Sequence, residues 1–181
     1  MPGVDSTTRS GKEAHPEHRP GHRKHNPCGP DHSSATHAFG REYKMSHGST
    51  HKLLDAYPKD LGGIDPHKLA ECIAACFDCA QACTACEDAC LSEDMVAELT
   101  KCIRTDLDCA DICTTTGNVL SRHTGYDANI TRAILQACAT ACKACAEECE
   151  QHAGMHEHCR ICAEACRRCE TACNELLASL G

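Results

Sequence analysis

The sequence predicts an all-α fold, an antiparallel up-down-up-down four-helix bundle, from three observations. Eighteen of the nineteen cysteines lie from Cys72 onward, and most repeat at alternating steps of four and three residues. That spacing keeps side chains on one stripe of an α-helix. The same region is rich in alanine and has no proline after Pro66, which favours helix throughout. Four such segments joined by short turns fold most simply as a bundle.

The first helices can be placed from their capping and breaking residues. A short helix is expected over residues 50–57, and it stops at Pro58. Asp65 and Pro66 then supply an N-cap and a proline at the first helical position. They predict a long helix that runs to about Leu91.

The middle of the chain predicts two further long helices. Ser92 or Asp94 is expected to cap the next helix, which continues to about residues 120–122. A polar stretch that contains Gly125 breaks the pattern, and the third long helix is expected over about residues 127–152.

A fourth long helix completes the predicted bundle. Gly154 marks the end of the third helix, and the fourth is expected over about residues 155–180. Helices of about 25 residues are some 37 Å long. The cysteines of the first long helix span about 27 Å of its axis. We therefore expect the four cysteine stripes to meet along one long tube.

The chain is expected to divide near residue 50. Residues 1–49 are predicted to form a disordered, histidine-rich extension, because they hold five of the seven prolines and few apolar residues. Residues 50–181 are predicted to form the bundle. The extension is interpreted either as a solvated tail or as a weak metal-gathering arm, and Met45 permits a downstream translation start. The side chains available to such an arm are His15, His18, His22, His25, Cys28, His32 and His37.

Charge and composition exclude several functions. Residues 1–51 hold 7 basic and 5 acidic residues, and the remainder holds 11 against 21, which gives the net charge of −8. An acidic bundle is a poor partner for nucleic acid or anionic membranes. The N-terminal residues show no apolar signal-peptide core, and no run suggests a membrane span. We expect a cytoplasmic protein, in which thiols stay reduced and clustered cysteines indicate metal.

The cysteines form eight CxxxC pairs. Side chains four apart on a helix have Cβ atoms about 5–6 Å apart, a gap that one metal ion can bridge. Cu(I) accepts two or three soft thiolates, whereas zinc requires four ligands at each site. The pairs are Cys72/Cys76, Cys79/Cys83, Cys86/Cys90, Cys109/Cys113, Cys138/Cys142, Cys145/Cys149, Cys162/Cys166 and Cys169/Cys173.

The two ends of the tube are predicted to differ. Counting along the stripes from Cys102, Cys149 and Cys159 leads to four donors other than cysteine at one end: Asp106, His152, Met155 and His156. We expect copper to pass from these weaker donors to the thiolates. At the other end the stripes continue into an apolar plug of Leu69, Leu120, Ile134 or Leu135, Leu176 and Leu180.

With these motifs, residues 50–181 closely resemble the cytosolic bacterial copper storage proteins. The resemblance implies a homotetramer in which each chain stores many Cu(I) ions, admitted at the polar end. The helix with Cys102, Cys109 and Cys113 departs from the pattern because it carries fewer cysteines. The expected metal ligands are Cys72, Cys76, Cys79, Cys83, Cys86, Cys90, Cys102, Cys109, Cys113, Cys138, Cys142, Cys145, Cys149, Cys159, Cys162, Cys166, Cys169, Cys173, Asp106, His152, Met155 and His156.

The predicted function is high-capacity cytosolic Cu(I) storage and detoxification, without catalysis. The expected partners are copper ions, further copies of the chain and a copper chaperone, with neither nucleic acid nor membrane. Two alternatives stay open: a zinc or Fe–S binding protein, and an enzyme, either a di-iron bundle or a thiol oxidoreductase. CxxC steps such as Cys76–Cys79 lie in mid-helix, away from the helix N-terminus that activates a redox thiol.

Overall fold

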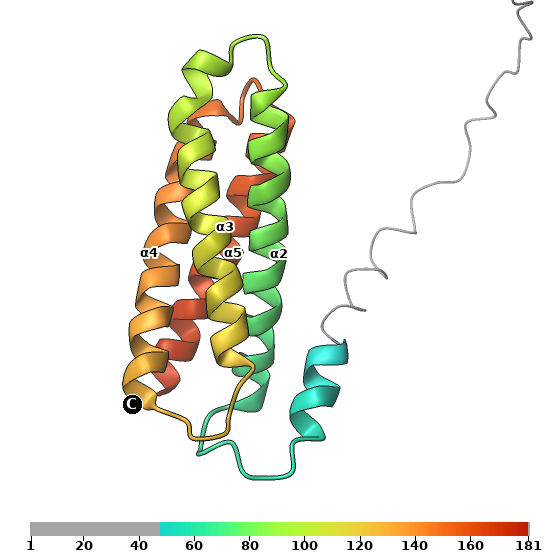
Figure 1. Cartoon of the computed structure of the whole chain (residues 1–181), viewed down its shortest axis with the longest axis vertical. Helices are drawn as coiled ribbons and strands as arrows, with labels where there is room; N and C mark the ends of the chain where they lie inside the picture. Colours follow the sequence, from blue (N-terminus) through green and yellow to red (C-terminus); the bar gives the residue numbers. More distant parts are fainter. Residues whose placement is uncertain (1–47, 181) are drawn as a thin grey trace, which may run out of the picture. The chain divides into compact units, whose positions relative to one another are not determined.

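The computed structural model describes residues 48–180 and consists of helices and turns over that range. Four long helices, α2 (Pro66–Leu91), α3 (Thr100–Leu120), α4 (Ala128–His152) and α5 (Glu157–Ser179), run up and down in turn (Figure 1). The predicted all-α four-helix bundle is therefore confirmed. The histidine-rich extension, as far as residue 47, lies outside the described residues.

Two long helices begin where the capping residues place them. The Asp65 carboxylate accepts hydrogen bonds from the backbone N–H groups of His67 and Lys68, at 2.9 and 3.2 Å, directly before α2. Asp127 caps α4 in the same way by accepting from the backbone N–H of Asn129 at 2.8 Å. These contacts satisfy N–H groups that have no partner within the helix. The short helix covers residues 48–55.

The expected start of α3 is wrong. Ser92 ends α2, and its hydroxyl donates back to the Asp88 carbonyl oxygen at 3.1 Å. The chain then forms a 3-10 turn, η1 (Val96–Leu99), before α3 begins at Thr100 without a side-chain cap. Leu99 is buried, so packing against the bundle, rather than a capping side chain, fixes this start.

Each long helix packs against two others: α2 and α4 each lie between α3 and α5. The α2–α3 connection and the α4–α5 connection share one end of the bundle, at the top of Figure 1. Between α2 and α3, the Phe77 ring lies over Gly117, where an added Cβ would come within 2.9 Å of it. The small residue therefore allows this pair of helices to approach closely.

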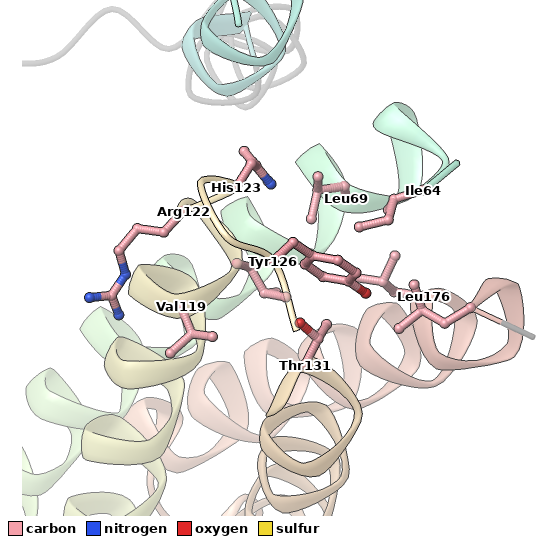
Figure 2. Close-up of a pocket in the computed structure, with 10 residues that line it drawn as sticks. Ile64, Leu69, Val119, Arg122, His123, Tyr126, Thr131 and Leu176 are labelled. Atoms are coloured by element: carbon pink, nitrogen blue, oxygen red, sulfur yellow. The ribbon is translucent and has the colours of Figure 1, made fainter. Parts of the chain in front are cut away.

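The opposite end of the bundle is closed by apolar side chains. Leu69, Leu120, Leu135 and Leu176 are almost completely buried, as the predicted plug requires, and Leu135 rather than Ile134 faces inward. Figure 2 shows this end, with the Tyr126 side chain extending toward Leu69 and Leu176. The remaining cavity is about 10 Å³, room for about one water molecule.

His123 lies beside this plug and is only partly exposed. Its ring packs edge-on against Tyr57, with ring centroids 5.2 Å apart, and its Nε2 is buried without a hydrogen-bond partner. Burial lowers the pKa of this imidazole, which favours the neutral form.

One expectation about membranes needs correction. By length and composition alone, α2 could cross a membrane, because alanine and cysteine count as apolar. The cysteines that give α2 this character lie in the bundle core, as is usual for a core helix of a bundle.

Candidate metal centre

The eighteen cysteines of the described residues line the axis of the bundle, and all are buried and free of disulfides. Cys86 is 2% exposed and the others are 0% exposed. Their inward direction follows from the alternating steps of four and three, which turn one stripe of each helix toward the axis. The predicted sulfur tube is therefore present.

Neighbouring sulfur atoms lie within reach of a shared metal ion. The shortest Sγ–Sγ distance, 3.4 Å, joins Cys113 of α3 to Cys142 of α4. Cys76 and Cys138 are 4.0 Å apart across the bundle, although α2 and α4 are not adjacent helices. Within one helix, the Cys79–Cys83 pair is 3.9 Å apart. Contacts between helices are thus as close as those within a CxxxC pair.

The sulfur atoms form overlapping groups rather than separate sites. Cys79 belongs to two groups of four sulfurs whose members lie within 4.8 Å of one another, and Cys169 also belongs to two. Zinc prefers four ligands of its own in a closed tetrahedron. Sulfurs shared between neighbouring groups instead suit Cu(I), which accepts two or three bridging thiolates.

Asp106 lies inside the tube, on the inward-facing stripe of α3, at a position where the other helices carry cysteine. Its carboxylate is completely buried and accepts hydrogen bonds from the thiols of Cys145, Cys162 and Cys149 at 2.9, 3.3 and 3.4 Å. Burial, together with the negative charge that Cys162 carries once its thiol is deprotonated, raises the pKa of Asp106 to about 8. This carboxylate is therefore poised to hold or release a proton beside the sulfurs.

Other residues occupy the remaining positions on the inward-facing stripe of α3, so this helix carries fewer cysteines. Thr116, also completely buried, donates its hydroxyl to the Ile112 carbonyl oxygen at 2.7 Å, and Leu120 follows it at the apolar end. The α3 wall therefore offers three sulfurs and one carboxylate.

His158 is the imidazole that reaches the sulfurs. Its Nδ1 lies 3.4 Å from Cys86 Sγ, 3.5 Å from Cys159 Sγ and 3.9 Å from Cys90 Sγ. Together the four residues form one group of possible metal ligands. Burial raises the pKa of the Cys90 thiol, so deprotonation there needs the help of a metal or a base.

The spacing of the cysteines also points to His158. Counting back three or four residues from Cys159 leads to His156 and Met155, whereas counting back four from Cys162 leads to His158. Positions four apart share a helical face, and α5 begins only at Glu157. Helical counting therefore applies to His158 but fails for the two residues before the helix.

His156 and His158 meet at one carboxylate. Glu93 Oε1 lies 3.0 Å from His156 Nδ1 and 3.3 Å from His158 Nε2. These hydrogen bonds, first from His158 and then from His156, lower the pKa of the Glu93 carboxyl. His156 is 7% exposed, and its Nε2 is buried without a hydrogen-bond partner.

His152 belongs to a different cluster on the α3–α4 side. Its Nε2 lies 3.5 Å from Glu148 Oε1, and the buried Glu148 carboxylate also pairs with Lys101. Met155, expected on the inward stripe, is instead 66% exposed. It lies in the turn before α5, where the helical period no longer sets the direction of a side chain.

Comparisons with known proteins agree with this geometry. A family model described as "Copper storage protein" matches residues 65–178. No curated protein sequence matches the chain.

Solved structures are also similar to this chain. The copper storage protein Ccsp from Streptomyces lividans, loaded with 10 copper equivalents, is 71% identical with a TM-score of 0.71, covering 72% of this chain and 98% of that chain. A five-copper form, described as a cytosolic copper storage protein, is 73% identical with a TM-score of 0.65, covering 66% and 100%. Cu(I)-bound BsCsp3 is 39% identical with a TM-score of 0.53, covering 59% and 94%.

Proposed function

The chain belongs to the copper storage protein family, and we propose that it stores Cu(I) on the thiolates of its eighteen core cysteines. The observation that carries this function is the sulfur tube itself. Free, buried sulfurs from four helices lie 3.4–4.0 Å from their neighbours along the bundle. Because the solved Streptomyces relative is described as cytosolic, the same compartment is assigned to this chain.

Charge supports Cu(I) as the stored ion. If each thiolate bridges two Cu(I) ions, the core holds about one ion per cysteine and stays nearly neutral, which avoids the cost of burying uncompensated charge. Thiols must lose their protons to bind. Uptake therefore releases protons and weakens as the pH falls.

The ligands of this proposal are the eighteen cysteines together with Asp106, His152, His156 and His158. Asp106 accepts hydrogen bonds from thiols within the tube, while the three histidines lie at the end of α4 and the start of α5. Copper is proposed to enter at this end, because the opposite end is filled by leucine. Met155, being exposed, is retained only as a donor on the outer surface.

The proposed activity is binding rather than catalysis. A di-iron bundle needs several inward glutamates and histidines, whereas the buried carboxylates of the described residues are Asp106 and Glu148. A thiol oxidoreductase relies on one or two activated thiols, whereas this tube holds many thiols in similar surroundings.

A homotetramer is proposed for the assembly, with a copper chaperone as a transient partner. Phe77, Leu107 and Ile161 are between 41% and 50% exposed, and they leave apolar surface on the outside of the bundle. Ile73, by contrast, is buried within the bundle. Light scattering of metal-free and copper-loaded protein tests the assembly, and a monomer in both states would contradict it.

Titration of reduced, metal-free protein with Cu(I) and with Zn(II), each in competition with a chelator of known affinity, tests the storage function. We expect about eighteen Cu(I) ions per chain and far fewer zinc ions. Saturation by a few ions of either metal would contradict storage and would favour the zinc alternative.

A pair of variants sharpens this titration. Cys113→Ser with Cys142→Ser removes the closest sulfur pair and should lower the Cu(I) capacity by roughly two to four ions, since bridging sulfurs serve more than one ion. Cys28→Ser is the matched control, because that cysteine precedes the bundle. Equal losses in the two variants would show that the core sulfurs are not the store.

A further inference from the structure

Glu93 holds the two histidines at the polar end through one oxygen atom. Oε1 lies 3.0 Å from His156 Nδ1 and 3.3 Å from His158 Nε2, and the imidazole centroids are 5.3 Å apart. Glu93 comes from the connection after α2, whereas the histidines flank the start of α5. This carboxylate therefore ties together the two connections at that end.

The chemistry of the carboxylate decides which nitrogen of each ring carries hydrogen. An ionised carboxylate only accepts hydrogen bonds. Both facing nitrogens must then be donors, which places hydrogen on Nδ1 of His156 and on Nε2 of His158. In a neutral imidazole, the other nitrogen then carries a free lone pair.

The free lone pairs lie on His158 Nδ1 and His156 Nε2, and each of these atoms is placed where it could bind a metal ion. His158 Nδ1 lies 3.4 Å from Cys86 Sγ and 3.5 Å from Cys159 Sγ, at the end of the sulfur tube. His156 Nε2 is buried without a hydrogen-bond partner. A buried polar atom without a partner carries a free-energy cost, and a bound cation would remove it.

We propose that Glu93 is a positioning residue for copper uptake: it fixes His156 and His158 in opposite tautomers, so that each presents an unprotonated nitrogen to Cu(I). This inference rests on the proposed storage function and deepens it. Glu93 itself does not bind copper in this role. Carboxylates that orient metal-binding imidazoles commonly act in this way, and their loss costs roughly 10–100-fold in metal affinity or activity.

The tautomers can be measured without any metal. In reduced, metal-free, full-length protein labelled with ¹⁵N-histidine, long-range ¹H–¹⁵N spectra at about pH 8 report the protonated nitrogen of each ring. His156→Ala and His158→Ala spectra supply the assignments. We expect hydrogen on Nδ1 of His156 and on Nε2 of His158. The reverse assignment for either ring in the parent protein would overturn the proposal.

In Glu93→Ala, both imidazole rings should lose the hydrogen bond that fixes their tautomer. We expect mixed tautomers in the spectra and uptake of the first Cu(I) equivalents slowed roughly 10-fold, with final capacity unchanged. Parental tautomers and rates in this variant would overturn the proposal. A low capacity in the parent protein itself would instead overturn the storage function, so the two failures are distinguishable.

Two further variants separate the hydrogen bond from charge and from folding. Glu93→Gln keeps an acceptor oxygen and should retain the parental tautomers and most of the uptake rate. Behaviour like that of Glu93→Ala would contradict the tautomer argument. Glu98→Gln makes the same chemical change in η1, at an exposed residue, and should match the parent. A slowed Glu98→Gln would show that general charge at this end, rather than ring orientation, controls uptake.

Discussion

At the polar end of the bundle the sulfur tube continues into imidazole and carboxylate groups, whereas at the apolar end it continues into leucine. His158 lies 3.4 Å from Cys86 Sγ at the first end, and Leu135 and Leu176 are fully buried at the second. Along the bundle, the same helical stripes carry imidazole and carboxylate groups first, then thiols, and then leucine side chains. The cysteines thus provide the capacity for copper, whereas the two ends determine where an ion can pass and how the bundle is stabilised.

The largest effect on stability is expected at the apolar end. Leu135→Ala removes a fully buried side chain and should lower the free energy of unfolding of the metal-free protein by about 3 kcal/mol. Chemical denaturation measures this change. Cu(I) capacity should stay at the parental value, because no sulfur is disturbed. A loss of capacity at constant stability would contradict the division of roles between plug and tube.

Asp106 is expected to give the next largest effect on the free energy of unfolding. Its raised pKa determines how that effect depends on pH. The folded protein holds the proton of Asp106 up to about pH 8, whereas an unfolded aspartate loses it near pH 4. The stability that this proton contributes is fully present below about pH 4, and it is lost as the pH rises through about 8.

Asp106→Asn should therefore raise the free energy of unfolding of metal-free protein by about 2–4 kcal/mol at pH 8, and by little near pH 4. Urea denaturation of reduced protein across this range measures the difference. Asp106 faces the thiols of Cys102, Cys145, Cys149 and Cys162, so the variant is compared with the parent protein at each pH. A stabilisation independent of pH would contradict this sign.

Substitutions at the polar end should change the rate of copper uptake and leave stability nearly unchanged, whereas substitutions in the plug should do the opposite. His152→Ala with His156→Ala is expected to slow Cu(I) uptake roughly 10-fold while capacity stays nearly constant. Stopped-flow absorbance at the thiolate–copper band measures the rate. The free energy of unfolding should change by less than about 1 kcal/mol, since both rings lie at helix ends. Parental rates would remove these histidines from the copper path.

The smallest effect on stability is expected from glycine substitutions, for which one glycine from each end of the bundle is compared. Gly125, in the α3–α4 loop, has φ of 67° and open space around its Cβ position. Gly125→Ala should therefore cost about 1 kcal/mol through backbone strain alone. Gly154, at the polar end, also has open space but is not among the positive-φ glycines. Thermal unfolding of Gly154→Ala should match the parent, and equal losses in both variants would contradict the backbone argument.

The sequence was sufficient to predict the bundle and the inward direction of the sulfurs. The alternating spacing of cysteines defines a helical face, and the Asp65–Pro66 pair marks the first residue of α2. Helical counting also identifies Asp106, although only the structure shows its complete burial among four thiols.

The connections could not be predicted in the same detail. Helical counting fails outside a helix, so it predicts an inward Met155, whereas this side chain is exposed. The start of α3 depends on the burial of Leu99 rather than on a capping residue. The Glu93–His156–His158 cluster joins residues more than 60 positions apart, and no local pattern reports such a contact.

Anomalous X-ray scattering at the copper edge, from crystals of fully loaded protein, tests the central claim most directly. We predict copper along the whole tube, from the His158–Cys86–Cys159 group to the Cys72–Cys173 pair, and none beside Leu135 or Leu176. Copper confined to surface histidines, or to a single site of four ligands, would contradict a continuous thiolate store.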